Sequence, residues 1–333
     1  MEGAHSEILR RLAETQLEQN TGYGSDKYTA SAKEKIKEVC GTPNADIVFL
    51  VGGTQTNQFA IDVLLRSYEG VISAKSGHIN VHEAGAIEYG GHKVLSVEHK
   101  NGKISAESID ECARAYAEDP SRLHTVKPAM VYISFPTEYG TIYSKAELTE
   151  IYEACRRNSL LLYIDGARLG YGLMSDECDL TIKDIAALCD VFYIGGTKVG
   201  ALCGEALVFT KGGAPENMLS LVKQHGALLA KGWLVGLQFD TLFTNGLYFD
   251  ISRHAIELAN RIKRALTEKG YRFFMDSPTN QQFVILENKQ IEALKSELLF
   301  EHWEKYDDEH SVVRIATSWA TPEENVERLI ELL

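Results

Sequence analysis

The sequence has few basic residues and no long apolar run. Lysine and arginine together number 34, against 47 aspartates and glutamates, so the formal net charge is -13. Such a chain repels a phosphate backbone or an anionic lipid surface, and we predict neither nucleic acid nor a membrane as partner. No stretch approaches the ~18 apolar residues of a membrane span, and the first residues lack a basic start followed by an apolar segment. We therefore expect a cytoplasmic protein.

Paired cysteines and metal signatures are also missing. The six cysteines lie far apart without a Cys-x-x-Cys pair, and we expect them to be reduced. His78 and His82 stand four residues apart with Glu83 adjacent, but a His-Glu-x-x-His motif fails at Ala86, so we predict no metal site. These histidines are either ordinary core or surface residues, or one imidazole lies against a cofactor ring.

What the sequence does contain, from residue 46 onward, is a regular alternation of short β-branched and aromatic runs with helical segments. This alternation predicts an α/β domain with a parallel sheet. Near Gly246 the pattern changes to one typical of a small α+β lobe, so we predict a large domain over residues 1–245 and a small one over 246–333. The last helix is expected to have Thr321 as its cap and Pro322 at its first helical position. The expected strands are 46–51, 71–74, 94–97, 129–135, 160–165, 191–195 and 206–209.

Two strand ends carry residues suited to cofactor chemistry. Lys198 follows Ile-Gly-Gly-Thr, an apolar setting that favours the neutral amine, the form that attacks an aldehyde. Alone, Lys198 is more simply interpreted as an exposed loop lysine. Asp165 ends the preceding strand 33 residues earlier, a spacing typical of one βαβ unit, with both groups at the carboxyl edge of the sheet. A pyridoxal-phosphate (PLP) ring needs an anion beside its protonated nitrogen, so the two residues together indicate a PLP enzyme.

A glycine-rich turn also follows the first strand. Gly52-Gly53-Thr54 opens a helix, and a helix N-terminus with small residues accommodates a phosphate. By itself this segment is an ordinary turn. It matches neither Gly-x-Gly-x-x-Gly nor the phosphate loop that ends in Gly-Lys-Ser/Thr, which argues against a nicotinamide or nucleotide cofactor.

Four motifs taken in order resemble the threonine aldolase branch of the fold type I PLP-dependent enzymes, within the wider group of β-eliminating lyases. They are Gly-Gly-Thr-Gln-Thr-Asn, His-(x)4-Glu-Ala-Gly, Asp-Gly-Ala-Arg and Gly-Gly-Thr-Lys. The resemblance covers essentially the whole chain, from Tyr23 to Arg314. It implies an aspartate aminotransferase-like fold with a mostly parallel seven-stranded sheet in a large PLP-binding domain, a small C-terminal α+β domain, and a homodimer or homotetramer.

The resemblance also implies roles for individual residues. Lys198 looks like the lysine that holds PLP covalently, Asp165 like the partner of the ring nitrogen, and His78 like the histidine stacked on the ring. Arg168 and Arg314 match the arginines that clamp the substrate carboxylate, a task suited to a planar, permanently charged fork. The other implied positions are Gly53, Thr54 and Thr197, which hold the phosphate, and Tyr23 and Lys223, which lie near the site across a dimer contact.

The implied reaction is retro-aldol cleavage of a β-hydroxy-α-amino acid, L-threonine or L-allo-threonine, to glycine and an aldehyde. One alternative is a PLP-dependent β-eliminating lyase acting on another amino acid, since the same lysine, aspartate and arginines would serve it. Another is a catalytically weak PLP-binding relative.

Two positions depart from the family pattern. Glu138 stands where better-known aldolases have a histidine; with an ordinary pKa of ~4.3 it needs burial to act as a base, so it is either the catalytic base or structural. The family also carries an N-terminal arm whose polar residue reaches the substrate carboxylate. Met1 to His5 begin after that arm, so either the chain starts late or this contact is missing.

Overall fold

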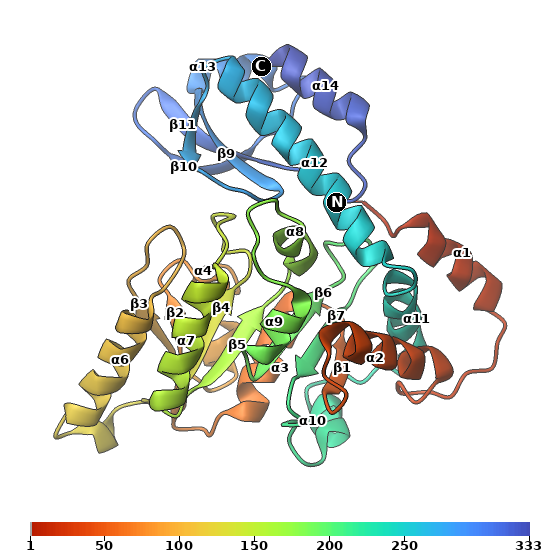
Figure 1. The fold of residues 1–333 in the computed structure, drawn as a ribbon, viewed down its shortest axis with the longest axis vertical. Helices are drawn as coiled ribbons and strands as arrows, with labels where there is room; N and C mark the ends of the chain where they lie inside the picture. Colours follow the sequence, from red (N-terminus) through yellow and green to blue (C-terminus); the bar gives the residue numbers. More distant parts are fainter. Residues whose placement is uncertain (1) are drawn as a thin grey trace.

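The computed structural model describes residues 2–333, which form a large α/β domain with a small domain beside it (Figure 1). The large sheet has the strand order β1-β7-β6-β5-β4-β2-β3. Strand β7 runs antiparallel to both neighbours, whereas the other pairs are parallel. The predicted fold class is confirmed, and every predicted strand lies within two residues of its observed bounds. The strands are β1 (Asp46–Leu50), β2 (Glu69–Ala74), β3 (Val94–Val97), β4 (Lys127–Ser134), β5 (Leu161–Asp165), β6 (Val191–Gly195) and β7 (Glu205–Phe209).

Helices cover both faces of this sheet. Strands β2, β6 and β7 are buried at every residue, as expected for a sheet covered on both sides. One face packs against α2 (Lys27–Cys40), α6 (Ala106–Glu118), α7 (Lys145–Arg157), α8 (Leu169–Leu173) and α9 (Ile182–Ala187). The other packs against α3 (Gly53–Leu64), α4 (His78–Val81), α5 (Ala86–Tyr89) and α10 (Met218–Gln224). A short 3-10 helix (Arg122–His124) precedes β4.

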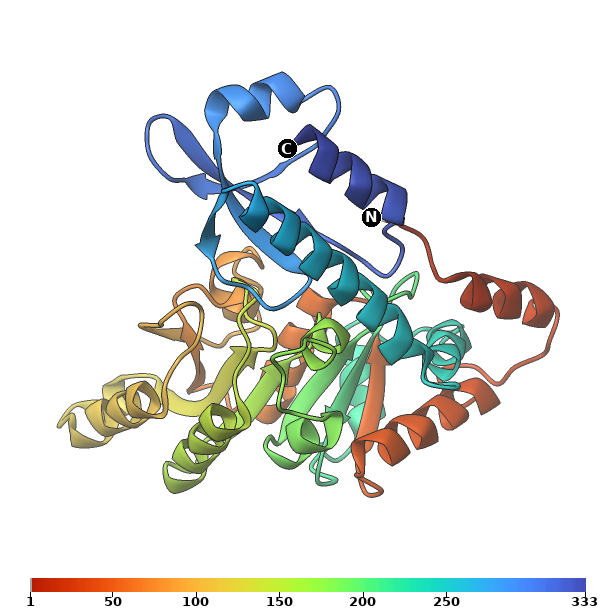
Figure 2. The same cartoon turned by 45° about the horizontal axis from the view of Figure 1, so that its top comes forward.

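The small domain is built on an antiparallel sheet of order β10-β11-β9-β8. Helix α12 runs between the domains (Figure 2): its first half packs on the core of the large domain and its second half on the small sheet. A domain boundary at Gly246 stays a prediction. The elements are α12 (Leu247–Glu268), β8 (Arg272–Met275), β9 (Gln281–Glu287), α13 (Asn288–Leu294), β10 (Glu301–Lys305), β11 (His310–Ala316) and α14 (Glu323–Leu332).

The predicted start of the last helix is wrong by one residue. Pro322 has extended backbone angles and occupies the cap position, so α14 begins at Glu323. The Thr321 hydroxyl accepts a hydrogen bond from the backbone N–H of Ser318 at 2.8 Å instead of capping the helix. The Thr321 side chain, which the sequence pattern predicted as the helix cap, thus stabilises the preceding turn.

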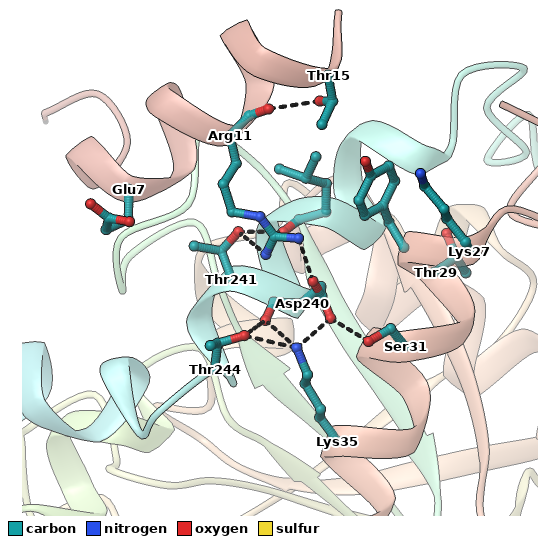
Figure 3. A network of polar contacts seen from close by, with 12 residues as sticks. Glu7, Arg11, Thr15, Lys27, Thr29, Ser31, Lys35, Asp240, Thr241 and Thr244 are labelled. Carbon is teal, nitrogen blue, oxygen red and sulfur yellow. Dashed lines mark hydrogen bonds and ion pairs between the residues drawn. The ribbon is translucent and has the colours of Figure 1, made fainter. Parts of the chain in front are cut away.

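A polar network fixes the N-terminal helices to the rest of the large domain (Figure 3). Asp240, on α11 (Trp233–Leu242), accepts hydrogen bonds of 2.6 Å from Arg11, Ser31 and Lys35. Arg11 belongs to α1 (Ser6–Thr15), and the other two donors belong to α2. A buried carboxylate requires such partners, and they join three helices around it. Among residues 2–333 no helix is long and apolar enough to cross a membrane.

Candidate active site

A cavity of about 800 Å³ between the two domains brings most of the predicted site residues together. Its wall combines residues that follow β4, β5 and β6 with residues of the small domain, at the sheet edge where α/β folds bind ligands. The predicted residues that line it are His78, Glu138, Arg168, Thr197, Lys198 and Arg314. Asp165 is not part of this wall and is buried, with 4% of its surface exposed.

Lys198 is held in an environment that favours its neutral amine. Burial, together with the positive charge of Arg168, lowers the pKa of Lys198 to about 8. The glycines before it are required by close packing, because a Cβ at Gly195 would lie 2.4 Å from the carbonyl oxygen of Ala167. The hydroxyl of Tyr171 donates to the Lys198 carbonyl at 2.6 Å. The lysine therefore projects from a closely packed segment, and more of its amine is neutral near pH 8 than in an ordinary lysine.

Asp165 is a buried carboxylate that stays ionised. Burial alone would raise its pKa, but hydrogen bonds, first among them that from Tyr132, bring the pKa below its usual value. Its Oδ2 accepts from the Tyr132 hydroxyl at 2.6 Å and from Asn57 Nδ2 at 3.0 Å, and its Oδ1 accepts from the Ala167 N–H at 2.9 Å. These donors hold a negative charge that acts on His78 and Lys198 in the cavity wall.

His78 is connected to Asp165 through two residues to which sequence reasoning gave no role. Glu83 Oε1 lies 2.8 Å from His78 Nδ1 and accepts from Asn57 Nδ2 at 2.7 Å. Asn57 therefore bridges Glu83 and Asp165. The hydrogen bond with Glu83 raises the pKa of His78. Asn57 and Glu83 both belong to the four family motifs, and no other feature of the sequence indicates a role for them. Their hydrogen bonds join parts of the chain that are far apart in the sequence.

Glu138 lies in the cavity wall and also supports the loop around it. Its Oε1 accepts from the Ser134 hydroxyl at 2.6 Å and from the backbone N–H of His78 at 3.0 Å. Burial raises the pKa of Glu138, which is the change a catalytic glutamate needs near neutral pH. The geometry therefore accommodates both interpretations of Glu138, and its role as a base stays a prediction.

The predicted phosphate site lies at the start of α3. Its N-cap is Gly52, which has no side chain that could accept hydrogen bonds from the first turn. The backbone amides of that turn and the positive end of the helix are therefore available to an anion. A Cβ at Gly53 would lie 3.3 Å from the Tyr193 hydroxyl. Thr197 Oγ1 accepts from the Gly204 N–H at 3.1 Å. Phosphate binding by Gly53, Thr54 and Thr197 remains a prediction.

The two predicted carboxylate-binding arginines reach the cavity from different domains. Arg168 follows β5, and Arg314 lies on β11. Burial, then the nearby charge of Arg314, lowers the pKa of Arg168. Two like charges close together favour an anion between them. The small domain is therefore part of the site.

Tyr23 and Lys223 are not brought to this cavity within one chain. The Lys223 ammonium lies 5.2 Å from the centroid of the Tyr23 ring, and Tyr23 lines a different hollow. Their placement near a site across a dimer contact stays a prediction.

The N-terminal residues lie next to the cavity. Glu2 lines it, and Glu2 Oε1 accepts from the Ser318 hydroxyl at 3.1 Å. A residue near the start of the chain therefore does reach the cavity, and it is an acidic one.

Together these groups fit PLP. Asp165 supplies the buried anion that a protonated ring nitrogen needs, Lys198 supplies a reactive amine, and the uncapped first turn of α3 suits a phosphate.

Comparisons with known proteins identify the family. The family model described as "Beta-eliminating lyase" matches residues 3–287. The low specificity L-threonine aldolase of Pseudomonas sp. is 29% identical over 311 residues, covering 92% of this chain and 87% of its own. The structure of Leishmania major threonine aldolase is 42% identical, with a TM-score of 0.96, and the match covers 99% of this chain and 96% of that one.

A more distant structure shows the same fold. A putative L-allo-threonine aldolase from Listeria monocytogenes has a TM-score of 0.76 at 18% identity, over 98% of this chain and 92% of its own. The chain belongs to the β-eliminating lyase family and, within it, to the threonine aldolases.

Proposed function

We propose that this chain is a PLP-dependent aldehyde-lyase that cleaves L-threonine or L-allo-threonine to glycine and acetaldehyde. The observation that carries the proposal is the pairing of Lys198, whose pKa is about 8, with the buried, ionised Asp165 at the ends of neighbouring parallel strands. Arg168 in the same cavity wall supplies a binding group for an α-carboxylate. The threonine aldolase relatives support this substrate class.

The proposed roles follow from the positions of the side chains. Bound PLP supplies an electron sink for the bond that breaks. Lys198 holds the cofactor, and Asp165 keeps the ring nitrogen protonated. Arg168 and Arg314 orient the substrate through its carboxylate, which determines which bond at the α-carbon is aligned for cleavage. Glu138 receives the proton of the β-hydroxyl.

The test is to identify the products. Purified protein with PLP and L-threonine should release acetaldehyde and glycine in equal amounts. Release of ammonia and a keto acid instead would assign the chain to β-elimination. Borohydride reduction followed by peptide mass spectrometry should find the pyridoxyl adduct on Lys198; its absence there would overturn the assignment of the cofactor anchor.

Replacing Glu138 with glutamine should lower threonine turnover at least about tenfold. Glutamine keeps an oxygen that accepts from Ser134 and the His78 N–H, so the loop is preserved while the base is lost. Steady-state kinetics measure the effect.

The matched control is Glu147→Gln. Glu147 also accepts a backbone N–H, as part of the capping box with Ser144, but it does not line the cavity. The Glu147→Gln variant should keep the original turnover. If Glu138→Gln also turns over at the original rate, Glu138 has no part in the chemistry.

The rate at which cofactor-free protein captures PLP should rise with pH and level off above pH 8. Only the neutral amine attacks, and the pKa of Lys198 is about 8, so below this pH the rate should increase about tenfold per unit. Stopped-flow absorbance measures capture. Arg168→Ala should move the midpoint upward, because the Arg168 charge helps to lower this pKa. A wild-type rate that keeps rising to pH 10 would contradict the lowered pKa.

We also propose a homodimer or homotetramer in the cytoplasm. Tyr23 and Lys223 contact each other away from the cavity of their own chain. In a dimer they would be available to a neighbouring site.

A further inference from the structure

Arg314 is not free in this structure. It lies directly opposite Glu301 in the pairing of β10 with β11. Its Nε donates to Glu301 Oε2 at 3.0 Å, and its Nη2 donates to Glu301 Oε1. Nη1 donates to Gln281 at 2.9 Å, and the Trp303 ring lies 5.3 Å from the guanidinium carbon. The Nε and Nη2 edge of Arg314, which could bind a substrate carboxylate in a bidentate manner, is therefore already occupied by the Glu301 carboxylate.

Arg168 differs from Arg314 in this respect. Both line the cavity, but within residues 2–333 the Arg168 side chain makes no hydrogen bond or ion pair, and the Arg314 charge acts on it directly. A substrate carboxylate can bind Arg168 without displacing another side chain. To bind Arg314 through the same edge it must take the place of the Glu301 carboxylate, because two anions cannot occupy one guanidinium fork.

The position of Glu301 allows it to be displaced. Strand β10 is the edge of the small sheet, and its pairing with β11 is irregular just after Glu301, between His302 and Glu304. The Glu301 side chain is 56% exposed, against 17% for Arg314. Ion pairs with an exposed partner contribute little to stability, and the released carboxylate would be hydrated. Arg314, in contrast, is held by Gln281 and Trp303 and remains in place.

We propose that Glu301 competes with the substrate carboxylate for Arg314 and so weakens substrate binding. It lowers the affinity for every amino acid that binds through its carboxylate and leaves the later chemical step unchanged. This inference rests on the proposed function, because it requires a substrate whose α-carboxylate binds Arg314.

The experiment compares Glu301→Gln with the original PLP-loaded enzyme. Calorimetry measures the binding of glycine, and of glycinamide, which keeps the amine but lacks the carboxylate. The variant should bind glycine about fivefold more tightly and glycinamide unchanged. The KM for L-threonine should fall by the same factor with kcat preserved. Glu304→Gln, on the same strand and outside the cavity wall, should change none of these values.

A double variant tests whether the effect acts through Arg314. Arg314→Met removes the charge for which Glu301 and the substrate compete, so adding Glu301→Gln to it should no longer improve glycine binding. Unchanged glycine binding in Glu301→Gln would overturn the proposal. Weaker glycine binding would also overturn it, and would show that Glu301 positions Arg314 for the substrate. Equal improvement for glycinamide would overturn it as well.

Failure of the proposed function has a different signature. If the original enzyme binds glycine but releases no acetaldehyde from threonine, the aldolase assignment fails while the glycine comparison still tests Glu301. Normal acetaldehyde release with unchanged glycine affinity in Glu301→Gln would overturn only the role of Glu301.

Discussion

Lys198→Ala is expected to reduce threonine cleavage by about 10³-fold or more, because alanine removes the amine that holds the cofactor. Among residues 2–333, Lys198 is the one lysine that lines the cavity, and its pKa is about 8 because burial and the Arg168 charge oppose its protonation. Acetaldehyde release measures the rate. Borohydride reduction should leave no pyridoxyl group on the peptide that contains residue 198.

The control for this variant is Lys93→Ala, which removes an exposed lysine outside the cavity wall. It should keep both the activity and the adduct on Lys198. Thermal unfolding should show that Lys198→Ala is folded, so that the loss of activity is not a loss of structure. Substantial cleavage by a folded Lys198→Ala protein would refute the role of this residue as anchor.

Asp165→Asn is expected to lower kcat by about 10²-fold or more, because a neutral amide cannot hold the positive charge that the PLP ring needs. The amide is similar in size, and its oxygen can still accept from Tyr132, Asn57 or the Ala167 N–H. We therefore expect a folded protein that captures PLP through Lys198 but turns over slowly. Measurements of bound PLP and of kcat on the same sample separate the two properties.

Tyr132→Phe is the graded comparison for Asp165→Asn. It removes one hydrogen bond to the carboxylate, the largest of the contributions that lower the pKa of Asp165, while the charge is retained. It should reduce kcat less than Asp165→Asn does. If Asp165→Asn turns over at the original rate, the buried carboxylate is not the partner of the ring.

The sequence by itself determined the architecture and was enough to predict a cofactor anchor at Lys198. Each strand of the large sheet contains a local run of mostly apolar residues, and such runs are recognisable without knowing where the chain goes next. All seven strands of that sheet were therefore predicted within two residues. The step from Asp165 to Lys198 was informative for a similar reason, because a single βαβ unit has a limited length and ends both strands at one edge. The start of the last helix was misjudged because Thr321 had a competing partner in Ser318.

Only the tertiary structure decided how the site residues are held. Asn57 bridges Glu83 and Asp165, Glu138 accepts the His78 N–H, and Glu301 occupies the fork of Arg314. Glu2 reaches the cavity from near the start of the chain. A hydrogen bond depends on the position and direction of both partners to within a fraction of an ångström. For residues far apart in the sequence that relation exists only once the sheet has formed and the small domain has packed against it.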